Sequence, residues 1–236
     1  MPNRLAAVAA LALAAALASC TPTTTPATTT TTTAQHAEGP AADTTTGAGT
    51  PLSDAINSIP TAAEHRTGYT RDAFHLWIDA DHNGCNTRQE VLIAQAVTAP
   101  TVGPRCSLTG GSWRSYYDDT TVTSAHQLDI DHVVPLAEAW DSGAWTWTAD
   151  RRERYANDLA GGRSLIAVTA HANRSKGDDD PAEWMPPAAD AQCTYAADWV
   201  RMKLRWNLTA DTAEKTALAR IAASCSTTTV AYTPAS

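Results

Sequence analysis

Apolar positions along the second half of the chain follow two periods, and these periods separate predicted strands from predicted helices. A β-rich section that closes with residues 128–134 predicts one short strand, and a continuous apolar run over residues 165–169 predicts a second, buried one. Two sets of side chains then recur at helical spacing and predict two closing helices: Tyr195, Trp199, Met202 and Trp206, followed by Ala213, Ala217, Ile221 and Cys225. The pattern predicts an α+β fold that ends in a helical hairpin.

Shorter amphipathic stretches predict further helices over residues 53–59, 69–78, 87–97, 136–140 and 151–155, and another that begins at Asn173. Ser53 is the expected cap of the first of these helices. Thr87 is the expected N-cap of residues 87–97, with Glu90 completing a capping box. A β-rich section is expected between residues 113 and 134.

The amino terminus resembles an export signal. Arg4 precedes an apolar run from Leu5 to Ala18, which is shorter than a membrane span and typical of a signal peptide. The run ends at Leu17-Ala18-Ser19-Cys20, which is similar to a bacterial lipobox and predicts lipidation of Cys20 after removal of residues 1–19. Ordinary signal cleavage, with Cys20 incidental, is the alternative.

Residues 20–50 consist mostly of Thr, Ala, Pro and Gly and offer few large apolar side chains to bury, which predicts a disordered tether. Residues 51–236 are long enough for one domain with its own core. We therefore expect an exported domain, held at the extracellular face of the cell membrane as a lipoprotein or secreted outright.

Four of the five cysteines follow the tether: Cys85, Cys106, Cys193 and Cys225. An even number in an exported chain favours two disulfides. Pairing Cys85 with Cys106 and Cys193 with Cys225 is favoured, because each pair brackets one contiguous unit. A zinc site is the alternative, but no Cys-x-x-Cys pair supports it.

The formal net charge of -8 argues against a strongly basic, nonspecific nucleic-acid coat. It leaves room for a nuclease, which needs only a local basic track. Basic residues that could supply one are Arg151, Arg152, Arg154, Arg163, Arg174, Lys176, Arg201, Lys203 and Arg205. The alternative is that they lie on solvated helix faces.

The most informative polar residues are Asp131 and His132, which stand at the end of a predicted strand just before Pro135. With Asn173 at the start of a helix after the next strand, the three can meet at one site. The oxygens of Asp131 and Asn173 suit Mg²⁺ or Mn²⁺, and His132 can act as general base on water. A simple hydrogen-bonded Asp–His pair is the alternative.

Ordered motifs across the domain resemble the HNH (ββα-metal) nuclease superfamily, and more closely exported actinobacterial HNH-endonuclease-like proteins. They are Asn83-Gly84-Cys85-x-Thr87-Arg88, Asp129-Ile130-Asp131-His132-Val133-Val134-Pro135-Leu136, Tyr155-Ala156-Asn157-Asp158, Leu165-x-Ala167-Val168, and Asn173-x-x-Lys176-Gly177-Asp178 with Trp184-x-Pro186-Pro187. The resemblance implies a ββα-metal core with surrounding helices.

The resemblance also implies roles for matching positions. His132 would be the general base, Asp131 and Asn173 the metal ligands, and Asn157 would hold the loop. Lys176, one helical turn after Asn173, is expected to reach a phosphate oxygen. Because other HNH members carry His where this chain has Asn173, magnesium is favoured over zinc. His171 is interpreted as a neighbour of the site.

The expected activity is endonucleolytic hydrolysis of nucleic acid by a monomer. DNA is the expected substrate, and little sequence specificity is expected because no groove-reading motif is present.

A second motif, Asp79-x-Asp81-x-Asn83-Gly84-x5-Glu90, matches the EF-hand calcium loop, with Cys85 contributing its carbonyl. Asn86 departs from the apolar residue usual at its position. An Asx-rich turn with a capping box is the alternative.

Two other functions compete with an exported nuclease. One is a non-enzymatic calcium-binding surface lipoprotein with a decayed nuclease fold. The other is a toxin-like effector with the same chemistry, ranked lower because no delivery module is present.

Overall fold

The structure is a computed structural model and describes residues 49–236. The predicted signal peptide, the predicted lipid anchor at Cys20 and nearly all of the predicted tether lie outside the described residues. Within residues 49–236, every helix is too short or too polar to span a lipid bilayer.

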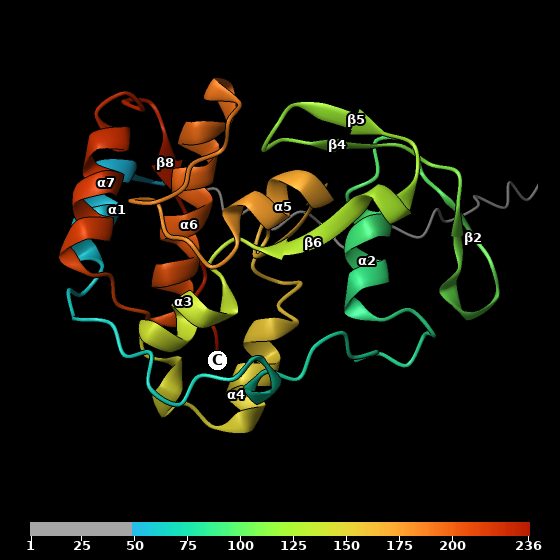
Figure 1. The fold of residues 1–236 in the computed structure, drawn as a ribbon, viewed down its shortest axis with the longest axis horizontal. Helices are drawn as coiled ribbons and strands as arrows, with labels where there is room; N and C mark the ends of the chain where they lie inside the picture. The colour runs from blue at the N-terminus through green and yellow to red at the C-terminus, as the bar shows by residue number, and fades with distance from the viewer. Residues whose placement is uncertain (1–48) are drawn as a thin grey trace, which may run out of the picture. The chain divides into compact units, whose positions relative to one another are not determined.

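The strands pair as two-stranded antiparallel sheets (Figure 1). These pairs are β1 (Thr50–Pro51) with β8 (Thr229–Val230), β2 (Thr101–Val102) with β3 (Leu108–Thr109), β4 (Trp113–Ser115) with β5 (Thr120–Val122), and β6 (Leu128–His132) with β7 (Leu165–Thr169). In the last pair the register places His132 opposite Leu165. Both strands of this pair are almost wholly buried. The continuous apolar run of β7 predicts its burial, whereas β6 buries Asp131 and His132 together with its apolar residues.

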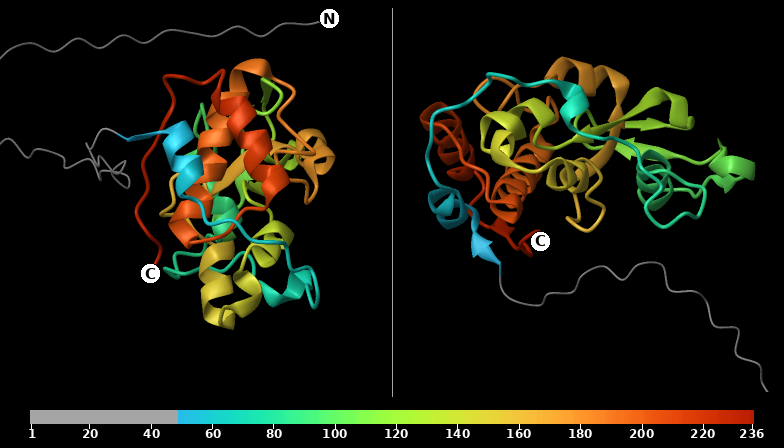
Figure 2. Two further views of the ribbon diagram at one scale, coloured as in Figure 1. Left: turned by 90° about the vertical axis from the view of Figure 1, so that its left-hand side faces the viewer. Right: turned by 90° about the horizontal axis from the view of Figure 1, so that it is seen from below.

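Helices accompany these sheets and make the fold α+β. They are α1 (Leu52–Ser58), α2 (Thr87–Ala94), α3 (Leu136–Asp141), α4 (Ala149–Ala156), α5 (Ala170–Lys176), α6 (Gln192–Trp206) and α7 (Thr212–Ala222), with single 3-10 turns over Arg71–Ala73, Pro104–Cys106, Ala125–Gln127, Ala144–Thr146 and Ala189–Ala191. Figures 1 and 2 show α1, α6 and α7 packed together at one end, with α5 and β6 lying between them and α2.

Two apolar clusters fill the interior. The larger one joins α1, α3, α6 and α7 through side chains such as Trp199 and Leu218. The smaller one packs Val91 and Leu92 of α2 against Trp113 and the sheet of β6 and β7. The Trp113 indole donates a hydrogen bond of 2.6 Å to the Leu92 carbonyl oxygen, so its buried N–H is satisfied.

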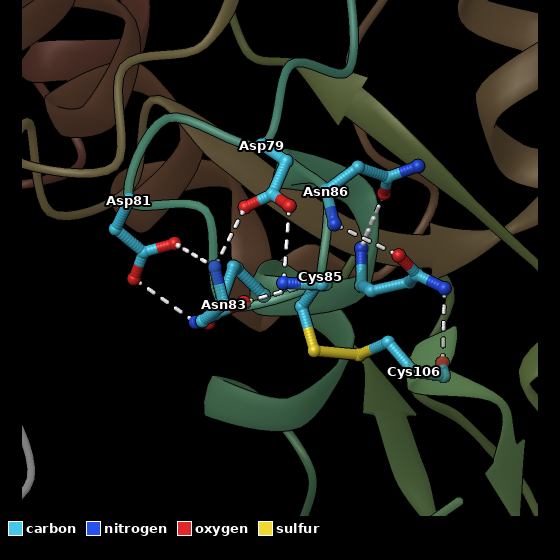
Figure 3. The surroundings of a disulfide bond; sticks show 9 residues. Asp79, Asp81, Asn83, Cys85, Asn86 and Cys106 are labelled. Atoms are coloured by element: carbon cyan, nitrogen blue, oxygen red, sulfur yellow. Dashed lines mark hydrogen bonds between the residues drawn. A yellow bond between two sulfur atoms is a disulfide. The ribbon is translucent and has the colours of Figure 1, made fainter. Parts of the chain in front are cut away.

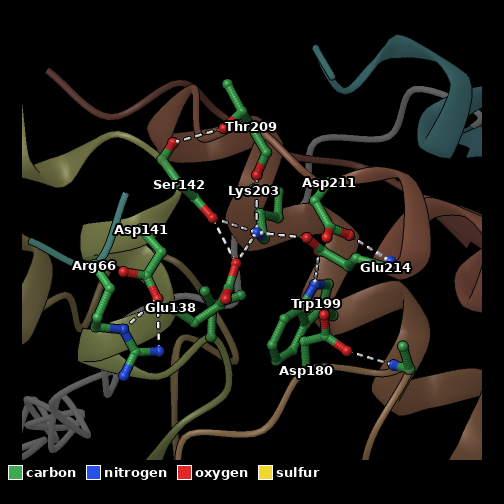
Figure 4. Close-up of polar contacts among 12 residues, drawn as sticks. Arg66, Glu138, Asp141, Ser142, Asp180, Trp199, Lys203, Thr209, Asp211 and Glu214 are labelled. Carbon is green, nitrogen blue, oxygen red and sulfur yellow. Dashed lines mark hydrogen bonds and ion pairs between the residues drawn. The ribbon is translucent and has the colours of Figure 1, made fainter. Parts of the chain in front are cut away.

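A buried polar cluster ties α3 to the closing helices (Figure 4). The Lys203 ammonium, with no exposed side-chain surface, donates to Glu138 Oε1 at 2.5 Å and to Glu214 Oε2 at 2.9 Å. It also contacts Ser142 Oγ at 2.7 Å and the Thr209 carbonyl oxygen at 2.8 Å. Because two buried carboxylates share one ammonium, burial and the nearby charge of Glu138 raise the pKa of Glu214 to about 7 despite its bond to Lys203.

Both predicted disulfides are confirmed. Cys85 pairs with Cys106, and their Cα atoms are 5.1 Å apart. Cys193, in α6, pairs with Cys225, just after α7, with a Cα separation of 5.5 Å. The second bond closes the predicted helical hairpin, and the alternative of a zinc site on these cysteines is excluded.

The helix predicted over residues 69–78 is wrong. This segment contains only the 3-10 turn Arg71–Ala73, and Trp77 has a left-handed backbone with φ of 58°. Its backbone is instead drawn onto α4, because the Asn157 side chain bonds both the His75 carbonyl oxygen and the Ile78 amide. Tertiary hydrogen bonds here override local helix propensity.

Three helix starts also differ from prediction. Asn86, not Thr87, is the N-cap of α2, and Gln89, not Glu90, completes its capping box. At α1, Pro51 stands at the cap without a side-chain bond, so Ser53 is not the cap. Thr169 caps α5 by accepting a bond from the Ala172 amide, which starts that helix at Ala170 and places Asn173 in its middle.

Candidate functional site

A pocket of about 230 Å³ lies where the end of β6 meets α5. Asp131 and His132 enter it from β6, and Asn173 enters it from α5. Arg71, Arg174 and Asp178 supply its other charged lining residues. The antiparallel pairing of β6 with β7, followed at once by α5, is what brings these separated residues together.

Asp131 is buried, and its carboxylate is held by two side chains. Lys176 Nζ lies 2.9 Å from Oδ1 and 2.8 Å from Oδ2, and the Tyr117 hydroxyl donates to Oδ2 at 2.6 Å. Burial nevertheless raises the pKa of Asp131, and the contacts with Lys176 and Tyr117 oppose that rise. Since a carboxylate has about four acceptor positions, the free capacity is on Oδ1.

His132 is buried, and its ring has a defined tautomer. Nε2 lies 2.9 Å from the carbonyl oxygen of Ala156, at the carboxyl end of α4. Because a carbonyl oxygen only accepts, Nε2 carries the proton and Nδ1 is left as the basic nitrogen. Burial lowers the pKa of His132 to about 4, so the ring is neutral at neutral pH.

Asn157 holds the segment that covers His132. Its Oδ1 accepts from the Ile78 amide at 3.2 Å and from Thr87 Oγ1 at 2.7 Å, and its Nδ2 donates to the His75 carbonyl oxygen at 2.7 Å. Between the two attached backbone positions lies Trp77, whose ring centroid is 6.0 Å from that of His132. Asn157 is therefore placed to fix a loop against the histidine, and it does not line the pocket itself.

Lys176 does not occupy the position that its spacing from Asn173 predicted. Its side chain has no exposed surface, and its ammonium is engaged by Asp131 and by the His132 carbonyl oxygen at 3.0 Å. The packing of α5 on β6 turns this position inward, so an approaching phosphate would meet other groups. His171 is exposed and is absent from the pocket lining.

Oxygen atoms available for a metal ion are few in this pocket. Asn173 Nδ2 donates to Asp129 Oδ2 at 3.3 Å, which leaves its amide oxygen without a donor among residues 49–236. Within the same residues, no group of three or more His, Cys, Asp or Glu side chains is arranged to hold a metal. The donor set fits a hard cation that keeps most of its water ligands, as Mg²⁺ does, and does not fit a zinc site built from protein ligands.

The loop from Asp79 to Glu90 is closed by its own hydrogen bonds (Figure 3). Asp79 accepts from the Asn83 and Gly84 amides at 3.1 and 3.0 Å. The side-chain Nδ2 of Asn83 donates to Asp81 Oδ2 at 2.9 Å and to Glu90 Oε1 at 2.8 Å. These contacts describe an Asx-rich turn next to the Cys85–Cys106 disulfide, and calcium binding there stays a prediction.

Most of the basic residues singled out in the sequence are used within the fold. Arg163 and Arg201 pair with Asp198, and Arg205 pairs with Asp158. Of the whole set, only Arg174 lines the pocket. Arg201 and Arg205 therefore serve ion pairs with buried carboxylates, which neither the basic track nor the solvated helix faces predicted.

Sequence reasoning missed three contributors to the site. Ala156 acts through a backbone carbonyl, which no side-chain pattern reveals. Tyr117 stands fourteen residues before Asp131 on the chain and was expected only as part of a β-rich section. Arg71 lies in a segment that was assigned to a helix on apolar spacing alone.

Comparison with known proteins bears on this arrangement. The family described as GmrSD restriction endonucleases, C-terminal domain, matches residues 100–221, which include Asp131, His132, Asn157 and Asn173. An uncharacterized secreted protein of Arthroderma benhamiae is 44% identical over 158 residues, which cover 67% of this chain and 76% of the relative. No solved structure matches the chain.

Proposed function

The chain belongs to the family of GmrSD restriction endonuclease C-terminal domains, and from this membership we propose that it is an exported endonuclease that hydrolyses phosphodiester bonds. Restriction endonucleases act on DNA, so DNA is the proposed substrate, cut with little sequence specificity. One observation carries the proposal: a single pocket gathers a neutral histidine of fixed tautomer with Asp131 and Asn173.

His132 is the proposed general base. With Nε2 held by the Ala156 carbonyl, Nδ1 accepts a proton from the water that attacks phosphorus. The bound phosphate brings negative charge next to the ring and raises the imidazole pKa toward neutrality, which favours that proton transfer. Asn157 acts as a positioning residue, since it fixes Trp77 and its loop beside the ring.

Asp131 Oδ1 and the Asn173 amide oxygen are the proposed ligands of one Mg²⁺ or Mn²⁺ ion. When bound, such an ion would neutralise charge developing on the phosphate and its leaving oxygen. Lys176 holds the buried Asp131 carboxylate in place and partly compensates its negative charge. The antiparallel pair of β6 and β7, followed by α5, is in this proposal the ββα-metal core of an HNH nuclease.

Export is proposed from the amino-terminal pattern and from the secreted relative. Both disulfides suit an oxidising compartment outside the cytosol. Lipidation at Cys20, a tether that follows it and a monomeric domain complete the proposal. The competing function is calcium binding at the Asp79–Glu90 loop by a protein without nuclease activity.

A metal titration separates the roles of ligand and base. Nicking of supercoiled plasmid would be measured across Mg²⁺ concentrations, with linear DNA, single-stranded DNA and RNA as further substrates. Asn173→Ala should raise the Mg²⁺ concentration for half-maximal rate by about tenfold or more. His126→Ala, at an exposed histidine outside the pocket, should match the wild type.

The same assay decides between the proposed function and its competitor. Cleavage that is independent of added metal, or unaffected by Asn173→Ala, would remove the proposed metal site. If the wild type cleaves no nucleic acid with Mg²⁺, Mn²⁺ or Zn²⁺, the nuclease proposal is wrong. Calcium binding that Glu90→Ala abolishes would then support the competing function.

A further inference from the structure

A phosphate that enters the pocket must be met by positive charge, because Asp131 and Asp178 already line the pocket. Lys176 cannot supply that charge, since its ammonium is buried against Asp131. The basic side chains that do line the pocket are Arg71 and Arg174.

The two arginines differ in how they are engaged. Arg174 lies 3.4 Å from Asp129 Oδ2, in an exposed ion pair. The Arg71 side chain is exposed, and no hydrogen bond or ion pair with another residue between 49 and 236 engages its guanidinium. Its planar donors are thus available for two oxygens of one phosphate.

The backbone that carries Arg71 is fixed to the core. The Phe74 amide donates to the Arg71 carbonyl oxygen at 3.1 Å, and Arg152 Nε donates to the Ala73 carbonyl oxygen at 3.0 Å. Phe74 is buried, and its ring centroid lies 6.0 Å from that of Tyr155. A turn held in this way fixes the position of the arginine backbone, so binding has to order only the side chain.

We propose that the Arg71 guanidinium binds a substrate phosphate at the mouth of the pocket, next to the phosphate that is hydrolysed. This inference rests on the proposed nuclease function. Arg71 lies before residues 100–221, so a segment outside the matched family region completes the substrate site. Arg174 of α5 lies within that region, and in this proposal it contacts the same nucleic-acid strand as Arg71.

The charge around the pocket also sets the path of the substrate. Asp178 lines both this pocket and a neighbouring one of about 270 Å³, whose other acidic residues are Glu64, Glu138, Asp180, Glu183 and Asp211. Arg66 is the one basic residue in that lining, so the excess of carboxylates repels phosphates. The nucleic-acid strand therefore leaves the pocket on the side of Arg71 and Arg174.

Steady-state cleavage of a DNA substrate by Arg71→Ala, Arg71→Lys and Arg220→Ala tests this inference. Arg220 is an exposed arginine of α7 outside the pocket and is the matched control. Arg71→Ala should raise KM by roughly 10- to 100-fold with kcat changed by less than about threefold, as expected for loss of a charged hydrogen bond to bound substrate. Arg71→Lys should recover part of the loss.

Salt dependence gives a readout that a merely structural role would not change. Loss of one phosphate contact should reduce the slope of log kcat/KM against log salt by about 1 in Arg71→Ala and leave it unchanged in Arg220→Ala. If the wild type cleaves DNA and Arg71→Ala matches Arg220→Ala in KM and slope, Arg71 binds no phosphate and the nuclease proposal still stands. A wild type that cleaves no nucleic acid overturns both.

Discussion

Glu214 is a buried carboxyl whose ionisation should weaken the fold as the pH rises. Its pKa is raised to about 7 from an ordinary value of 4.5, by burial first and by the charge of Glu138 second. The folded state therefore favours the protonated form, and this contribution is fully present below pH 4.5 and is lost as the pH rises to about 7. At about 1.4 kcal/mol for each tenfold change in proton affinity, the loss amounts to about 3 kcal/mol.

Urea unfolding of the wild type and of Glu214→Gln between pH 4 and pH 8 would isolate this effect. Glutamine cannot ionise, so the stability of the wild type relative to Glu214→Gln should fall by about 3 kcal/mol across that interval. Exposed Glu183→Gln controls for the removal of a surface charge. A difference that is flat, or that grows in favour of the wild type as the pH rises, would refute the reasoning about the Lys203 cluster.

Four further predictions test the fold around the site. Lys176→Met should lower the free energy of unfolding by about 3–5 kcal/mol, because it leaves a buried carboxylate unpaired; a change under 1 kcal/mol in urea unfolding contradicts this. Asn157→Ala should lower the free energy of unfolding by about 2–3 kcal/mol and reduce nicking, because its hydrogen bonds to the loop of residues 75–78 are lost; an unchanged melting temperature and nicking rate contradict this. Replacing Cys85 and Cys106 together by Ser should cost about 3 kcal/mol, and equal denaturation midpoints would disprove it. Calorimetry should show calcium binding that Glu90→Ala abolishes; no heat with the wild type would leave only an Asx-rich turn.

The two strands at the centre of the site were predictable because the signal for each strand is local. Residues 165–169 form β7 just as their continuous apolar run indicates, and the strand predicted over residues 128–134 forms β6 over its first five positions. β7 is apolar on both faces, so the sequence shows its burial directly, whereas the buried Asp131 and His132 of β6 are compensated by contacts that only the fold provides. The convergence of Asp131, His132 and Asn173 on one pocket followed from that topology.

Residues whose placement depends on long-range contacts were harder to predict. Lys176 was expected to face a phosphate because it lies one helical turn after Asn173, yet spacing along a helix does not say which face packs on a sheet. α5 lies on β6 with Lys176 inward, where the charge of Asp131 compensates its burial.

The helix prediction for residues 69–78 was wrong for a related reason. Apolar residues between 69 and 78 suggested a helix, while the bonds that shape this segment come from Asn157, far along the chain. Arg71 and the Ala156 carbonyl were missed because neither carries a motif. Their roles exist only once the chain has folded.

The rate of plasmid nicking by His132→Ala, relative to the wild type in saturating Mg²⁺, shows whether His132 is the general base of a nuclease. Circular dichroism and thermal unfolding of both proteins would establish that the variant is folded. Removal of a general base should lower the rate by about 10²- to 10⁴-fold, with the metal requirement of the residual activity unchanged. A folded His132→Ala variant that nicks plasmid as fast as the wild type would contradict the account.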